Sequence, residues 1–260
     1  MRQVLLPAYT LCKREIVRFY RQRSRVIGAL LPPILFWFFI GTGLGGSFHH
    51  QANSEINYLQ YFFPGTIVMI VLFTAIFSTI SIIDDRKEGF LQSVMVAPVP
   101  RVSIVLGKIM GGAILAFLQG LVFVLLAPLL KTHFSLTMFL FILVMLFSVS
   151  FGLTGLGFLI AWKMDSTQGF HAIMNLFLMP LWFLSGALFP MEGAPTWLRW
   201  AMILDPLTYS VAALRHGFYA PALYQPGTFP TPLFCLIATL IFCAVTFGLS
   251  VAVCQNSTSS

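Results

Sequence analysis

Long apolar runs separated by short polar stretches dominate this chain. Six of the runs are about as long as a helix that crosses a bilayer, which needs roughly 20 mostly apolar residues. A segment that crosses lipid must satisfy its own backbone hydrogen bonds, so each run predicts a membrane-spanning helix. We expect an all-α integral membrane protein with six transmembrane helices, at residues 26–46, 62–83, 104–130, 135–162, 170–189 and 231–254.

The polar stretch between the second and third runs, residues 84–103, concentrates charge. Five consecutive charged residues open it, an apolar turn follows, and two prolines come near its end. Because proline stops a helix, this pattern predicts a short amphipathic helix at the membrane surface, with acidic residues at its start where the helix dipole favours them. A solvated loop is the alternative, but a rigid helix here suits the transmission of force from a partner. The residues expected to take part are Asp84, Asp85, Arg86, Lys87, Glu88, Gly89, Phe90, Leu91, Pro98, Pro100 and Arg101.

Residues 8–25 have one apolar face and one basic face when plotted on a helix. The basic face carries Arg14, Arg18, Arg21 and Arg25. This pattern is typical of a helix that lies in the plane of the membrane. The arginines either set the topology and attract anionic lipid, or form a docking surface for a cytoplasmic partner. We therefore divide the chain into an interface helix, residues 1–25, and one transmembrane domain, residues 26–260.

Residues 190–219, before the last run, break the pattern. Two apolar helical pieces, about residues 196–204 and 207–218, are each too short to cross a bilayer. They predict a re-entrant helical hairpin on the outer face, broken at Asp205-Pro206; an amphipathic surface loop is the alternative. Its polar groups are expected to contact one another and hold an outer gate. The candidate gate residues are Glu192, Trp197, Trp200, Asp205, Pro206, Tyr209 and Arg215.

Composition and charge agree with a membrane protein and set its orientation. The chain is 58% hydrophobic and only 9% charged, whereas a soluble domain has about 25% charged residues. With six crossings and both termini in the cytoplasm, only Lys131, Arg199 and Arg215 of the 15 Lys and Arg residues lie outside. Cytoplasmic loops carry the excess of positive charge, so the bias supports this orientation in the inner membrane. The net charge of +7 therefore points to the lipid bilayer and not to nucleic acid.

Several kinds of chemistry are missing from the sequence. No apolar run carries an acidic or basic residue at its centre, where ion-coupled carriers usually need one. There is no GxxxxGK[ST] phosphate-binding motif, and the four cysteines do not have metal-site spacing. We expect no cofactor or metal in this chain and no catalytic residue, so energy must come from a partner.

Two stretches resemble the ABC type-2 permeases, the membrane subunits of ABC exporters. The first is DDRKEGFL at residues 84–91, followed by APVPR at 97–101 and Gly107-Lys108. The second runs from LSGALFP at 184–190 to LDPLTY at 204–209 and Ala213-Leu214-Arg215. The chain looks closest to the drug and nodulation-factor exporter branch of daunorubicin-type permeases. Asp84-Asp85 departs from the mixed pair of many members, which leaves the contact with the partner open.

The resemblance implies a fold, partners and a function. Two such subunits pair, most simply as a homodimer, and each docks a separate ATPase that binds ATP and Mg. The loop after the second span acts as the coupling helix, and the hairpin before the last span forms re-entrant outer helices. The implied function is export of an amphiphile, such as a drug, lipid or lipo-oligosaccharide, out across the cytoplasmic membrane. A polysaccharide exporter and a non-transporting membrane assembly factor are the alternatives.

Overall fold

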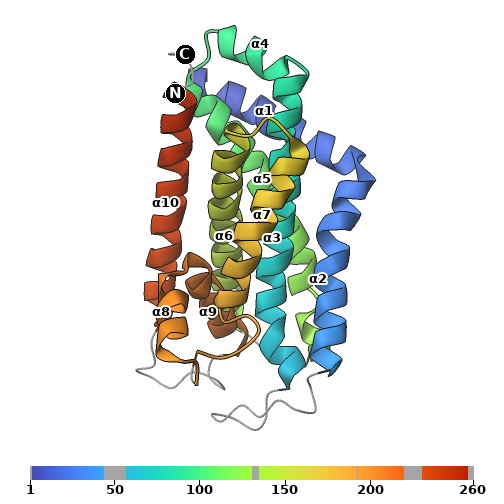
Figure 1. Cartoon of the computed structure of the whole chain (residues 1–260), viewed down its shortest axis with the longest axis vertical. Coiled ribbons are helices and arrows are strands. Elements are labelled where there is room, and N and C mark those ends of the chain that lie inside the picture. The colour runs from blue at the N-terminus through green and yellow to red at the C-terminus, as the bar shows by residue number, and fades with distance from the viewer. Residues whose placement is uncertain (1, 44–56, 131–134, 192, 220–229, 257–260) are drawn as a thin grey trace.

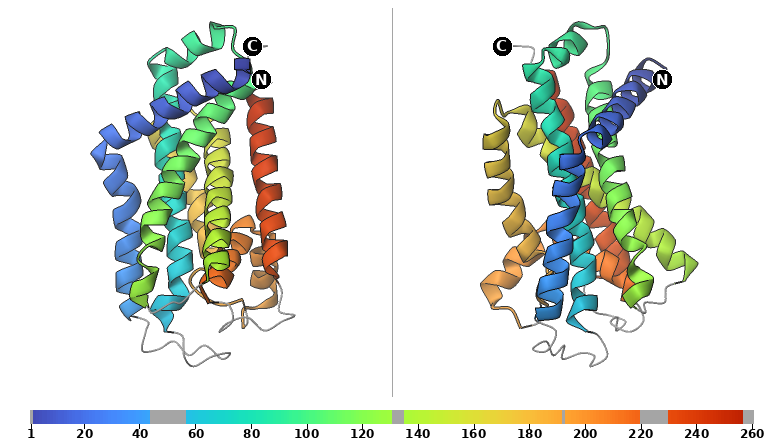
Figure 2. Two further views of the ribbon diagram at one scale, coloured as in Figure 1. Left: turned by 180° about the vertical axis from the view of Figure 1, so that it is seen from behind. Right: turned by 90° about the vertical axis from the view of Figure 1, so that its right-hand side faces the viewer.

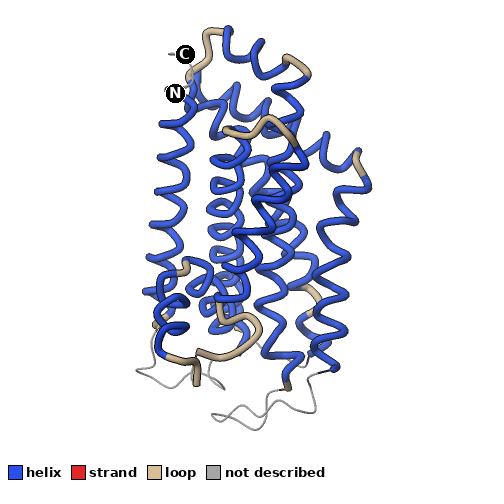
Figure 3. Tube along the Cα trace, viewed as in Figure 1, coloured by secondary structure: helices blue, strands red, loops and turns tan. Residues whose placement is uncertain are grey.

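The computed structural model of the chain describes residues 2–43, 57–130, 135–191, 193–219 and 230–256. Those residues form helices and connecting turns, with no strand among them (Figures 1 and 3). The predicted all-α class is therefore confirmed. The helices are α1 (Arg2–Arg21), α2 (Arg23–Gly43), α3 (Tyr58–Lys87), α4 (Phe90–Val96), α5 (Arg101–Val124), the short 3₁₀ helix η1 (Ala127–Leu130), α6 (Leu136–Trp162), α7 (Thr167–Leu184), α8 (Thr196–Leu204), α9 (Pro206–Tyr219) and α10 (Pro232–Asn256).

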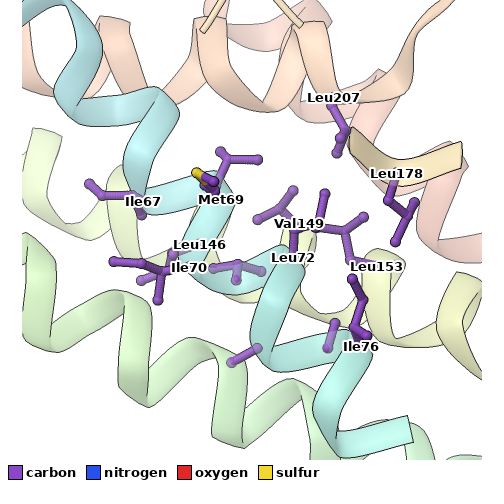
Figure 4. Packing of buried hydrophobic residues seen from close by; sticks show 14 of the residues in the cluster. Ile67, Met69, Ile70, Leu72, Ile76, Leu146, Val149, Leu153, Leu178 and Leu207 are labelled. Atoms are coloured by element: carbon purple, nitrogen blue, oxygen red, sulfur yellow. The ribbon is translucent and has the colours of Figure 1, made fainter. Parts of the chain in front are cut away.

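The long helices form a bundle around α3. In the most apolar window of α3, 89% of the residues are buried, against 17% in the corresponding windows of α2 and α10. Helix α3 packs against α2, α5, α6, α7 and α9. Figure 4 shows Leu72 and Ile76 of α3 close to Val149 and Leu153 of α6, within the buried hydrophobic cluster. A helix that is apolar on every side must be buried this way or face lipid, and α3 is buried.

Five of the described helices are long and apolar enough to cross a membrane: α2, α3, α5 with η1, α6 and α10. The predicted fifth run, residues 170–189, corresponds to α7, which ends earlier, at Leu184. The chain turns there because Gly186 adopts a left-handed conformation, with φ of 76°. Helix α7 runs from the end of the bundle that carries α4 towards α8 (Figures 1 and 2). That it makes a sixth crossing remains a prediction.

The two ends of the bundle differ in character. Helix α1 lies across one end, close to α4 and to both ends of the chain, whereas α8 and α9 lie at the opposite end (Figures 1 and 2). The predicted helix at residues 8–25 is shorter at its C-terminus than expected, because the chain breaks at Gln22 and α2 begins at Arg23. Arg25 therefore belongs to α2 and not to the amphipathic helix. We call the end with α1 and α4 the terminal end and the other the hairpin end.

Candidate functional site

A buried carboxylate at the terminal end of α3 collects three cationic side chains. Asp85 is fully buried, and its oxygens accept hydrogen bonds from Arg14 at 2.7 and 2.8 Å, from Arg18 and from Lys108. These partners come from α1 and α5, so one carboxylate joins three helices. Its hydrogen bond to Arg14 raises the pKa of that guanidinium, so Arg14 stays a cation beside the carboxylate.

Further ion pairs surround this centre. Glu15 accepts a bond from Lys108 at 2.6 Å, Asp84 pairs with Arg25 at 2.7 Å, and Glu88 pairs with Arg18 at 2.9 Å. The group contains four acidic and four basic side chains, so its formal charges balance. A buried charge needs an opposite partner, and balance permits this many charges at one site. We name as the ionic cluster the residues Arg14, Glu15, Arg18, Arg25, Asp84, Asp85, Glu88 and Lys108.

Close packing of α1 on α5 brings the cluster together. A Cβ atom on Gly107 would lie 2.7 Å from the carbonyl oxygen of Ala8, and one on Gly111 would lie 2.7 Å from the Cβ of Glu15. Glycine at these two positions lets the helix backbones approach, as small residues four apart do in membrane helices. Helix α1 packs against the two glycines of α5, and this close packing places Glu15 beside Lys108.

The structure overturns one expectation about these charges and argues against one of the two alternatives for the arginines of α1. Asp84 to Lys87 form the last turn of α3 and not the start of a surface helix, because nothing interrupts the helix before Gly89, whose φ is 73°. Acidic residues at a helix C-terminus gain nothing from the helix dipole, and arginines compensate them instead. Likewise Arg14 and Arg18 of α1 point inward to Asp85 and so do not form an outward docking face, whereas Arg21 is exposed.

The short helix predicted in this region is present as α4. It is anchored by Leu91, which is 3% exposed, and by Phe90, whose ring centroid lies 3.7 Å from the guanidinium carbon of Arg14. Such a stack is a favourable cation–π contact. At its other end Val96 is 88% exposed, although it is apolar. Helix α4 is therefore fixed to the ionic cluster on one side and open on the other.

The remaining predicted residues of this region flank α4. Lys87 and Pro98 are exposed, Pro100 directly precedes α5, and Arg101 is the first residue of α5 and half-buried. Arg86 faces away from the ionic cluster and caps α6, since it donates to the carbonyl oxygens of Trp162 and, at 3.2 Å, Met164.

At the hairpin end the structure confirms the two short helices and the break between them at Asp205. The carboxylate of Asp205 accepts a hydrogen bond from the backbone N–H of Leu207 at 2.9 Å and so caps α9. Burial raises the pKa of Asp205 to about 7. Tyr209 on α9 reaches back and donates to the carbonyl oxygen of Ile203 at 2.7 Å, while Pro206 begins α9. These contacts fix the angle between α8 and α9. That the hairpin dips into a membrane remains a prediction.

The expected polar contacts between gate residues do not form among the described ones. Arg215 donates to the carbonyl oxygen of Gly186 at 3.0 Å and stacks over Tyr61, so it does not reach Asp205. Trp197, Arg199 and Trp200 are exposed on α8. Arg215 and Asp205 are instead each hydrogen-bonded to a backbone group that lies nearer in space. Glu192 lies outside the described residues.

Sequence reasoning missed two members of the ionic cluster. In the sequence Lys108 stands out only in the Gly107-Lys108 pair that resembles the family, and no partner is predicted for it, yet its side chain is 3% exposed and pairs with two carboxylates. Glu15 looks like one acid within a basic helix, and nothing local links it to a lysine 93 residues away. Lys108 could have been found from the sequence because it is a charged residue inside an apolar run, and a buried charge requires a partner.

A bundle of long apolar helices with buried ion pairs at one end defines a multi-pass membrane protein. The sequence profile of the family described as ABC-2 type transporter matches residues 8–219, so the chain belongs to that family and is a membrane transport permease.

Named relatives agree with this assignment. A protein of Cyanophora paradoxa, provisionally named transport permease ycf38, is 28% identical over 254 residues, which cover 92% of this chain and 86% of the relative. Nodulation protein J of Sinorhizobium fredii is 27% identical over 235 residues, with 90% and 86% covered. The inner membrane transport permease YadH of Escherichia coli is 26% identical over 211 residues, with 79% and 80% covered.

Proposed function

We propose that this chain is the membrane subunit of an ATP-driven exporter and moves an amphiphilic substrate out across the cytoplasmic membrane. The substrate class is a drug, a lipid or a lipo-oligosaccharide, and a separate ATPase subunit supplies the energy. Family membership supports the general assignment, and similarity to a nodulation protein supports the exporter branch. ATP and Mg are bound by the partner.

The observation that carries the coupling role is the position of α4. This helix stands at the terminal end, beyond the ends of the long helices (Figure 1), and exposes Val96. An isolated apolar side chain on a short helix suits a small pocket on a partner surface. The ATPase therefore binds α4 and the exposed residues Lys87, Glu88 and Pro98 beside it.

A movement of α4 passes into the bundle through the ionic cluster. Phe90 stacks on Arg14, Arg14 binds Asp85, and Asp85 binds Lys108 in α5. These contacts are short and mostly buried, so α1, α3 and α5 respond to α4 as one unit. In this proposal Asp85 transmits force inside the permease and does not itself touch the ATPase.

The complete exporter contains two copies of this chain and two ATPase subunits, with both permease termini in the cytoplasm. A single chain has six predicted crossings, and paired subunits most often follow twofold symmetry. The outer faces of α2 and α7 expose large apolar side chains in the single chain, among them Phe38, Phe39, Leu176 and Phe177. By family resemblance the first and fifth spans, which correspond to α2 and α7, line the path at the dimer interface.

The test replaces the exposed apolar contact of α4. With the permease and its ATPase in proteoliposomes, Val96→Glu should abolish substrate-stimulated ATP hydrolysis and association with the ATPase, because a desolvated carboxylate opposes docking. Val96→Leu is the matched control and should retain both. The melting temperature of the permease alone should stay unchanged, since this residue is solvent-exposed. Normal stimulation by substrate in Val96→Glu would refute the docking proposal.

A further inference from the structure

An open pocket of about 410 Å³ lies between α4 and the terminal end of the bundle. Its size is within the range of sites that hold small molecules. Helix α4 forms one wall, and the ends of α3, α6 and α10 form the other. The lining residues are Arg86, Leu91, Gln92, Met95, Trp162 and Val253.

The charge of this pocket favours an anionic group. Among the described lining residues Arg86 is the only charged one. Its guanidinium donates to two carbonyl oxygens, which leave its positive charge in place, and to the carboxylate of Asp165 at 3.4 Å. The Asp165 side chain is 93% exposed, so solvent strongly screens its ion pair with Arg86 and little of the positive charge is offset. The guanidinium also lies over the Trp162 ring, 5.6 Å from its centroid, which holds its orientation.

The pocket continues into an apolar stripe on α10. From Val253 the residues Leu249, Val245 and Ile241 follow at intervals of four, on one face of the helix. Each of these three is about half exposed, and α10 is among the least buried of the long helices. A molecule with its charged head beside Arg86 can therefore lay an apolar tail along α10, where the membrane is expected.

We propose that this pocket binds the headgroup of an anionic phospholipid, with its acyl chains along the exposed face of α10. Arginine pairs well with phosphate, and basic pockets at the cytoplasmic ends of membrane helices suit anionic headgroups. The lipid fills the space under α4 and so supports the helix that meets the ATPase. The lipid lies in the cytoplasmic leaflet if both permease termini are cytoplasmic, so this part of the inference rests on the proposed function.

The experiment measures lipid retention by the permease alone, without ATPase or substrate. The purified chain is equilibrated with phosphatidylglycerol and phosphatidylcholine in mixed micelles, and bound lipid is counted by native mass spectrometry. Gln92→Glu places a negative charge in the pocket without touching the contacts of Arg86, and should weaken phosphatidylglycerol retention about fivefold. Ser93→Glu adds the same charge at the next residue of α4, outside the lining, and should retain lipid like the parent.

Each outcome decides the question. Preferential retention of phosphatidylglycerol that falls in Gln92→Glu, remains in Ser93→Glu and rises in Gln92→Lys supports the lipid site. No preference between the lipids, no loss in Gln92→Glu, or equal loss in both glutamate variants overturns it. Val96→Glu should retain lipid normally, so failure of the coupling proposal and failure of this one give different results.

Discussion

The ionic cluster makes a quantitative prediction at Asp85 and Lys108. Their side chains are 0% and 3% exposed, and they are bonded directly to each other. Removal of one member of a buried ion pair leaves an uncompensated charge and costs about 3–5 kcal/mol. The loss of stability in Asp85→Asn should lie at the upper end of this range, because Arg14, Arg18 and Lys108 each lose one of their carboxylate partners. Lys108→Met should fall at the lower end, because Asp85 keeps its two arginines.

The double variant separates the pair from its surroundings. Asp85→Asn with Lys108→Met removes both charges together, so its loss of stability should be about 2 kcal/mol less than the sum of the single losses, within the range for residues in contact. Unfolding is followed in detergent by tryptophan fluorescence, as a function of denaturant. The matched control is Asp165→Asn at the same end of the bundle, which removes a 93% exposed partner of Arg86 and should cost less than about 0.5 kcal/mol.

Additive single effects would refute this reasoning, because they would mean that the two side chains do not interact in the folded protein. Losses of stability in Asp85→Asn and Lys108→Met no larger than that in Asp165→Asn would also contradict this reasoning, because they would mean that the ionic cluster is exposed to solvent. In the exporter, the single variants should also weaken substrate-stimulated ATP hydrolysis, because α4 is held through this centre.

Two further predictions concern the packing of α1 and the hairpin end. Gly107→Ala should displace α1 and lower the free energy of unfolding by about 1–3 kcal/mol, because the new methyl group would meet backbone at 2.7 Å. Gly248→Ala, in a helix with open space at that position, is the control and should be neutral or slightly stabilising, as thermal unfolding will show. Asp205 has a folded-state pKa of about 7, raised by burial above its ordinary 3.8, so the folded protein keeps a proton that the unfolded chain releases. Stability linked to this group is therefore fully present below pH 3.8 and is lost as pH rises to about 7. Asp205→Asn retains the acceptor for Leu207 without the charge, and its stability advantage over the parent should grow by about 3 kcal/mol between pH 5 and pH 8. A constant difference between the two proteins across this pH range would contradict the burial of an ionisable carboxyl there.

Helix positions could be predicted from the sequence because they depend on local pattern. Each of the six apolar runs falls on a helix, and the break at Asp205-Pro206 separates α8 from α9 as expected. Proline, glycine and hydrophobic run length act over a few residues, and a membrane helix satisfies its own backbone hydrogen bonds. The ends were less accurate, as at Gln22 and Leu184, where the chain turns earlier than its hydropathy indicates.

The direction in which each charged side chain points was decided only by the tertiary structure. The same arginines of α1 fit an outward docking face or an inward one, and only the close approach of α1 to α5 at Gly107 selects the inward face. Asp85 then becomes the centre of a buried cluster, and Val96 is left as an exposed apolar contact. The reason is physical: ion pairing depends on distance and burial, and the partners of Asp85 in α1 and α5 come from distant parts of the chain. Local sequence determined where the helices are, whereas their packing determined which charges are inside.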